Sequence, residues 1–174
     1  MLTVESRLAF VESCLMNAFA GVVLGTGISI RQSEVIDRYR EGVTEAEFAA
    51  LPQGEITNDW SSVPLSELER ACVAHFDAEG LRYYIPALAL SVVRQYDGAS
   101  MRVIGTLSSL YPDKRAWHYH MDRYALLSGP QKVALATYLW HLPHLVPLEH
   151  EEPKQVERAL RDYWGSFLTE PYGA

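Results

Sequence analysis

The chain has 174 residues, of which 48% are hydrophobic and 21% charged, which is typical of one packed globular domain and excludes a disordered protein. Its formal net charge of −7 argues against a surface for nucleic acid or an anionic membrane, because both need clustered cations. No apolar run approaches the roughly 18 residues of a membrane span, and no secretory signal is visible. We therefore expect a single domain over residues 1–174, in the cytoplasm, with Cys14 and Cys72 as reduced core thiols.

Helical periodicity dominates the first part of the chain. Apolar residues recur at three- and four-residue steps, which predicts an amphipathic helix over about residues 4–19. Capping-box patterns at Ser29 and Thr44 predict the starts of two further helices. A fourth helix is predicted from Pro64 to Phe76, where apolar residues again share one face.

The most apolar stretch predicts the central helix, over about residues 78–96. Its stripe consists of Leu81, Ile85, Leu88 and Val92. Pro86 lies inside this stretch, so we expect a kink or a break there, because its ring displaces the carbonyl group four residues earlier.

The second half of the chain is less regular. Residues 101–111 fit a helix, although Gly105 weakens the pattern. Residues 117–122 alternate large apolar with polar side chains, which predicts a short extended segment. A capping box at Ser128 and a proline at position 153 predict the starts of two more helices. Together these patterns predict an all-α protein, a compact single-domain bundle of about seven helices.

Two blocks of sequence, with a shorter motif between them, are similar to a known family. The blocks are Leu24-Gly25-Thr26-Gly27-Ile28-Ser29, followed by Asp37 and Tyr39, and Phe76-Asp77-Ala78-Glu79-Gly80-Leu81-Arg82-Tyr83-Tyr84-Ile85-Pro86-Ala87, with Trp60, Val63-Pro64 and Leu68 between them. Over roughly residues 8–142 the chain resembles a bacterial domain-of-unknown-function family, numbered 6714. Its members read L-G-D-G-I-x-L, D-D-Y, W-x-x-I-P and F-L-D-P-E-G-F-R-F-Y-L-P-A-Y. The chain departs from this pattern at Thr26, Ala78, Leu81 and Leu88. The resemblance implies no established reaction, so it bears on the fold more than on the function.

The polar residues of these blocks are interpreted as a structural motif. The motif comprises Gly25, Gly27, Asp37, Asp77, Glu79, Gly80, Arg82 and Pro86. Asp77 is expected to cap the central helix, with Glu79 at the positive end of its dipole. Gly80 is expected to allow another backbone to approach closely. Arg82 is expected to pair with Asp37, because an arginine among apolar neighbours needs a partner.

Two chemical alternatives remain for this motif. Asp77, Glu79 and Arg82 are candidates for the site of a small enzyme, as a carboxylate pair with a cationic partner. The Gly25-x-Gly27 loop is a candidate anion cradle. A phosphate loop normally needs a preceding strand, a third glycine or a lysine, and none is present here, so we expect a turn between helices.

Four histidines are the candidate metal ligands. They are His118, His120, His141 and His144. A His-x-His pair on a strand places both rings on one side, where neutral nitrogens can chelate a metal. However, the second pair flanks a proline, and neither a His-Glu-x-x-His motif nor a cysteine at zinc spacing is present. We expect no metal and no cofactor, and a metal-binding protein remains the alternative.

Aromatic and acidic side chains are the candidate binding residues. Trp60 is a candidate apolar anchor inside an acidic rim, but the favoured interpretation is that it packs on Val63 and Pro64 as a loop plug. The expected binding residues are Trp60, Glu47, Glu55, Asp59, Trp117 and Tyr119. The leading hypothesis is a non-enzymatic protein-binding protein, such as an immunity protein that neutralises a bacterial toxin. We expect a basic protein partner, no nucleic acid, no membrane, and a monomer or a homodimer.

Overall fold

The computed structural model describes residues 3–98 and 100–168, and all regular structure in these ranges is helical. The α-helices are α1 (Val4–Ala18), α2 (Ile30–Asp37), α3 (Glu45–Ala50), α4 (Leu65–Leu68), α5 (Ala78–Arg94), α6 (Met101–Leu110), α7 (Trp117–Tyr124), α8 (Gly129–His141) and α9 (Glu152–Asp162). Short 3₁₀ helices are η1 (Trp60–Ser62), η2 (Val73–His75), η3 (Lys114–Ala116), η4 (Leu142–His144) and η5 (Trp164–Phe167). The all-α prediction is confirmed, and seven of the α-helices described have eight residues or more.

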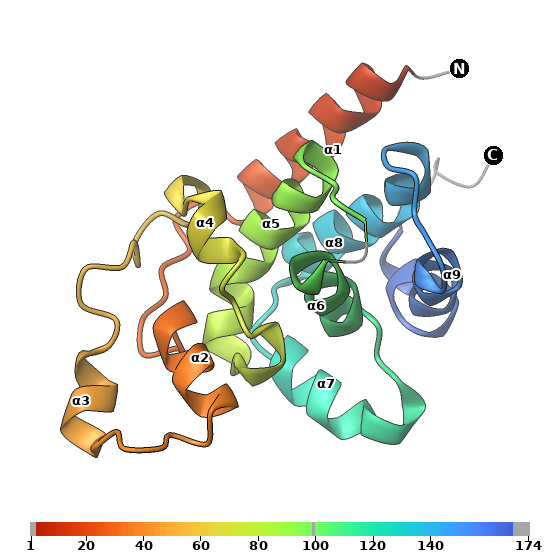
Figure 1. Cartoon of the computed structure of the whole chain (residues 1–174). Coiled ribbons are helices and arrows are strands. Elements are labelled where there is room, and N and C mark those ends of the chain that lie inside the picture. Colours follow the sequence, from red (N-terminus) through yellow and green to blue (C-terminus); the bar gives the residue numbers. More distant parts are fainter. Residues whose placement is uncertain (1–2, 99, 169–174) are drawn as a thin grey trace.

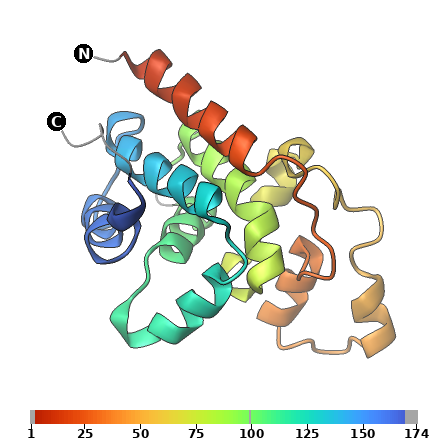
Figure 2. The same cartoon turned by 180° about the vertical axis from the view of Figure 1, so that it is seen from behind.

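Helix α5 forms the centre of the bundle and contacts α1, α4, α6 and α7 (Figure 1). Seen from behind, α1 and α8 lie side by side across it (Figure 2). The predicted stripe of Leu81, Ile85, Leu88 and Val92 is completely buried. The helix continues through Pro86, so of the expected kink or break the break does not occur. The position of the central helix was therefore predicted correctly from the sequence.

Side-chain caps fix the starts of several helices. The hydroxyl of Thr3 accepts a hydrogen bond from the Ser6 amide at the start of α1. The capping boxes at Ser29, Thr44 and Ser128 are all formed, so the predicted starts of α2, α3 and α8 are confirmed.

The predicted helix from Pro64 to Phe76 is wrong, because α4 ends after one turn at Leu68. The chain then turns so that its carbonyl groups face a buried arginine. The guanidinium group of Arg123 donates hydrogen bonds to the carbonyl oxygens of Val73 (2.6 Å) and Phe76 (2.9 Å). These long-range bonds replace the helical pattern that the local sequence favours.

The predicted extended segment at residues 117–122 is also wrong, because these residues form α7. The buried side chains are His120, Arg123 and Tyr124, at helical spacing. Two of these three are polar, so a search for apolar residues does not detect the buried face. Within the described ranges, none of the helices combines the length and the apolar character that crossing a bilayer requires.

Candidate functional site

The two family blocks meet at the start of α5. Glu79 Oε2 accepts hydrogen bonds from the amide (3.1 Å) and the hydroxyl (2.7 Å) of Thr26. Asp77 Oδ1 caps α5 through the Gly80 amide (2.8 Å) and also accepts from the Ile28 amide (3.0 Å). The expected cap by Asp77 is confirmed, and both carboxylates also hold the loop 25–28 against α5, a contact that was not predicted from the sequence.

The glycines of this contact serve different purposes. Gly25 has a φ of +62°, a conformation that favours glycine and turns the chain after α1. Gly27 lacks a positive φ and instead lies against the backbone of Gly80. The expected close approach at Gly80 is confirmed. Of the two glycines in the expected turn, Gly25 has the positive φ and Gly27 does not.

The expected pair between Arg82 and Asp37 is wrong. Asp37 Oδ1 lies 3.0 Å from Nε2 of His75, and the Nε atom of Arg82 is buried without a hydrogen-bond partner among the described residues. Helix α2 packs on η2, which brings His75 rather than Arg82 to Asp37. The local sequence around Asp77 carries no information on where α2 packs.

The four histidines do not converge. His118 is exposed and His120 is buried, because residues two apart on the helix α7 point in different directions. His141, which is buried at the end of α8, accepts a hydrogen bond at Nδ1 from Arg7 (3.0 Å), whereas His144 is exposed on η4. Within the described part of the chain, no three His, Cys, Asp or Glu side chains are grouped to hold a metal.

Burial and nearby cations lower the pKa of both buried histidines, His120 and His141. Burial lowers the pKa of His141 below its ordinary value, and the positive charge of Arg7 adds to the effect. Burial also lowers the pKa of His120, with a smaller contribution from Arg123. Both imidazoles are therefore neutral at neutral pH and act in packing.

The candidate anchor Trp60 is not exposed. Its side chain is 3% exposed, and its indole Nε1 donates a hydrogen bond to the carbonyl oxygen of Phe19 (2.8 Å). The two rings pack edge to face with centroids 6.4 Å apart. Trp60 is therefore buried, and its contacts are with Phe19 at the end of α1.

Glu55 is also not a rim residue, because its side chain is only 4% exposed. The carboxylate accepts hydrogen bonds from the hydroxyl of Ser29 (2.7 Å) and the amide of Arg31 (3.2 Å), at the N-terminus of α2. It also accepts one from the hydroxyl of Tyr84 (3.3 Å). A carboxylate at this position is favoured by the helix dipole, so Glu55 stabilises the start of α2.

The other predicted binding residues are dispersed. Asp59 is exposed, and the hydroxyls of Ser61 and Ser62 lower its pKa below the ordinary value, so it is ionised at neutral pH. Glu47 is exposed on α3. Trp117, at the start of α7, packs against Tyr163. Tyr119, 43% exposed, donates its hydroxyl to the Ala74 carbonyl. Helix α7 lies apart from α3 (Figure 1).

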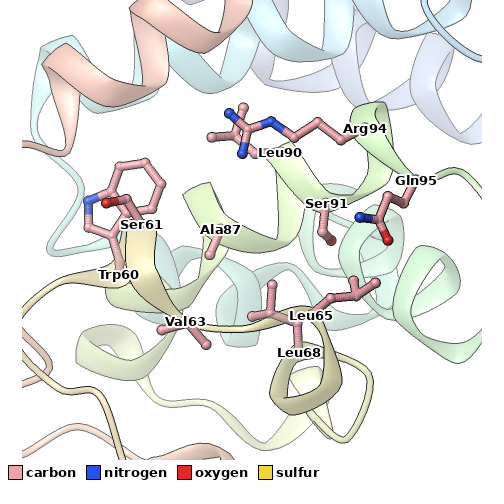
Figure 3. A pocket seen from close by; sticks show the side chains of 10 residues that line it. All are labelled: Trp60, Ser61, Val63, Leu65, Leu68, Ala87, Leu90, Ser91, Arg94 and Gln95. Atoms are coloured by element: carbon pink, nitrogen blue, oxygen red, sulfur yellow. The ribbon is translucent and has the colours of Figure 1, made fainter.

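Sequence reasoning missed a pocket of about 160 Å³ between α4 and α5, which we call the α4 pocket (Figure 3). Its lining residues are Trp60, Ser61, Val63, Leu65, Leu68, Ala87, Leu90, Ser91, Arg94 and Gln95. The spacing W-x-x-V-P indicates that Trp60 and Val63 act together, but it carries no information that α5 forms the opposite wall.

The walls of the α4 pocket are fixed by hydrogen bonds. The hydroxyl of Ser91 donates to the Leu88 carbonyl (2.7 Å) and accepts from the buried Arg102 (2.9 Å). Arg94, at the rim, donates from Nε to Glu12 of α1 (2.7 Å). Six of the ten lining residues are apolar, and the one charged lining residue, Arg94, has a side chain that is 52% exposed.

A second pocket of about 150 Å³ adjoins the α4 pocket at Val63, which lines both. Its polar lining includes Glu55, Tyr84, Arg31 and Glu67. Burial raises the pKa of the Tyr84 hydroxyl, which therefore stays protonated beside the Glu55 carboxylate. Of the predicted binding residues, the structure thus brings Trp60, Glu55 and Asp59 to one region.

Comparison with known proteins gives one match. The model of a family described as "Family of unknown function (DUF6714)" matches residues 8–167, further toward the C-terminus than the resemblance seen in the motifs. Searches of curated proteins and of solved structures gave no match.

Proposed function

The chain belongs to the family of unknown function DUF6714, and from its own surface we propose that it is a non-enzymatic protein that binds a basic protein partner. The observation that supports this proposal is the distribution of charge. The segment between Arg31 and Arg70 contains nine acidic and two basic residues, so its net charge of −7 equals that of the whole chain. The remainder of the chain is electrically balanced.

Much of this charge faces solvent. The exposed acids of the segment are Asp37, Glu41, Glu45, Glu47, Asp59 and Glu69. Part of this charge is already paired, since Arg40 within the segment pairs with Glu45 (2.9 Å) and Arg70, which bounds the segment and is not counted in it, pairs with Glu34 (2.7 Å). Arg38 is the only other base within the segment, so the surface that the segment offers to a partner keeps a net negative charge.

The segment also occupies one end of the molecule. Helix α3 lies at the periphery, joined on both sides by segments without regular structure, and it has no buried residue (Figure 1). A protruding acidic end attracts a cationic protein over about the Debye length, roughly 10 Å at 0.1 M salt, and orients it before contact.

One narrower form of this proposal is an immunity protein that neutralises a basic toxin. The acidic segment would then cover a cationic surface of the toxin. Co-expression tests this form: the protein should restore the growth of cells that produce its partner, and a partner that is harmless alone contradicts it.

Charge reversal tests the general proposal. A triple variant, Glu41→Lys, Glu45→Lys and Glu69→Lys, removes exposed acids from the segment and raises the net charge from −7 to −1. A matched control, Glu149→Lys, Glu151→Lys and Glu157→Lys, makes the same change at exposed acids of the balanced part.

The two triple variants are compared for affinity toward a partner isolated with the wild-type protein. The segment variant should bind about tenfold more weakly, since each rim charge contributes up to about 1 kcal/mol. The control should bind as the wild type does. Equal loss in both variants, or an acidic partner, contradicts the proposal.

A further inference from the structure

The α4 pocket has the size of one side chain. Its volume of about 160 Å³ is close to that of a cavity that holds a benzene-sized group, about 150 Å³. Pockets for cofactors and drug-sized ligands are larger, about 300–1,000 Å³. The space therefore suits a phenyl or branched aliphatic side chain and is too small for a nucleotide.

The lining of the pocket favours an apolar occupant. Trp60, Val63, Leu65 and Leu68 form one wall, and Ala87 and Leu90 of α5 form the other (Figure 3). Ser61 and Ser91 already use their hydroxyls in hydrogen bonds to Asp59 and to the Leu88 carbonyl. An apolar side chain would lose its contact with water here without leaving these groups unpaired.

The pocket exists before any partner binds. The indole of Trp60 is anchored to the Phe19 carbonyl, and the opposite wall belongs to the longest helix of the bundle. A preformed pocket requires little ordering of the protein on binding, which favours its use as an anchor site.

Charged residues near the α4 pocket determine which residues can flank the bound side chain in the partner. Asp59 bonds the lining residue Ser61, and the exposed Glu69 directly follows the lining residue Leu68. The charge of Arg94 is matched by Glu12 (2.7 Å), and the charge of Arg70, which follows Glu69, is matched by Glu34 (2.7 Å). The net charge that a partner meets around the pocket is therefore negative, which is complementary to lysine or arginine.

We propose that the α4 pocket binds a single apolar side chain, phenyl or branched aliphatic, presented by a basic segment of the partner protein. This inference rests on the proposed function, because the partner's basic character comes from it. The pocket adds the chemical identity of the anchor and the place where it is bound.

A library of random peptides displayed on phage, selected against the full-length protein, serves as the probe. Enriched peptides should carry a large apolar residue beside lysine or arginine. When that apolar residue is changed to alanine, affinity should fall by about tenfold or more, as expected for an apolar side chain that loses its burial. The indole N–H resonance of Trp60 should shift on binding, because this side chain lines the pocket.

Ala87→Leu fills the α4 pocket from α5 and should abolish binding of the enriched peptides. Ala18→Leu is the matched control, because Ala18 lines a separate groove between α1 and α8. Leu65→Ser, at a half-buried lining residue, is a second variant for the case that Ala87→Leu lowers the melting temperature.

The outcomes separate the two proposals. Basic peptides that bind wild type and Ala87→Leu equally, with or without their apolar residue, overturn the pocket inference and leave the basic partner standing. Enrichment of acidic peptides alone, or of none, overturns both. Loss of binding in Ala87→Leu and Leu65→Ser but not in Ala18→Leu supports both.

Discussion

Gly27 and Gly80 lie backbone to backbone where the glycine loop meets the start of α5. A Cβ atom built on Gly27 would lie 2.5 Å from the Gly80 amide nitrogen, and one built on Gly80 would lie 2.6 Å from the Ile28 carbonyl oxygen. Any side chain at either position would push the loop away from the helix. The hydrogen bonds of Asp77 and Glu79 to this loop depend on the same close contact.

Replacement of Gly27 by alanine should therefore lower the free energy of unfolding by about 1–3 kcal/mol, the usual cost of an overpacked contact. Gly129→Ala is the control, because a Cβ there meets no atom within 4 Å, and its effect should stay within about 0.5 kcal/mol. Urea denaturation of both variants provides the measurement. Equal unfolding free energies of the two variants would show that the loop moves to accommodate a Cβ atom at Gly27 without loss of stability.

Truncation of Leu88 to alanine should destabilise the protein by roughly 2–5 kcal/mol, because the side chain is completely buried in α5. Ile104→Ala, on the partly exposed face of α6, should cost much less. Thermal and urea unfolding compare the two. A loss near zero at Leu88 would mean that this face of α5 lies outside the core.

A double-mutant cycle checks the correction at Arg82. Because Asp37 contacts His75 and not Arg82, the effects of Arg82→Met and Asp37→Asn on unfolding should add within about 0.5 kcal/mol. A larger coupling energy would restore the pair that the sequence suggested.

The elements that could be predicted from the sequence are those that local chemistry determines. The caps at Ser29, Thr44 and Ser128 join residues three positions apart, so their patterns identify them. The wrong predictions concern segments whose conformation depends on residues distant in the sequence. Arg123 turns the chain after α4 through carbonyl groups about fifty positions away, and no local pattern contains that information.

The candidate site also combines features that the local sequence indicates with features that depend on distant contacts. The side-chain types of Trp60 and Glu55 mark them as candidates, and both lie in the region of the two pockets, but as buried residues rather than as an exposed rim. Their burial depends on Phe19 and on the start of α2, which are distant in sequence. The α4 pocket itself depends on how α4 packs on α5 and has no sequence signal.

Stability should decrease as the pH falls below neutral, in part through His141. Its folded-state pKa lies below the unfolded value of about 6.5. The contribution of the neutral ring is therefore complete above about pH 6.5 and is lost as the pH falls toward the folded pKa. Protonation would also remove the acceptor that Arg7 uses.

His141→Gln tests this pH dependence, because the glutamine side chain oxygen can accept from Arg7 but does not titrate. The variant should lose less unfolding free energy than wild type between about pH 7 and pH 5.5. Chemical denaturation across that range is the measurement. Identical slopes in both proteins would show that another group controls the acid sensitivity.

Whether the segment between Arg31 and Arg70 attracts a basic partner is tested most directly by the association rate constant. Stopped-flow measurements with the isolated partner, from about 0.05 to 0.3 M salt, should show a rate constant that falls steeply with salt, because screening removes electrostatic steering. The Glu41→Lys, Glu45→Lys and Glu69→Lys triple variant should associate more slowly at low salt and show a weaker salt dependence. A wild-type rate constant that does not change with salt, or a triple variant that associates as fast as wild type, would contradict the account.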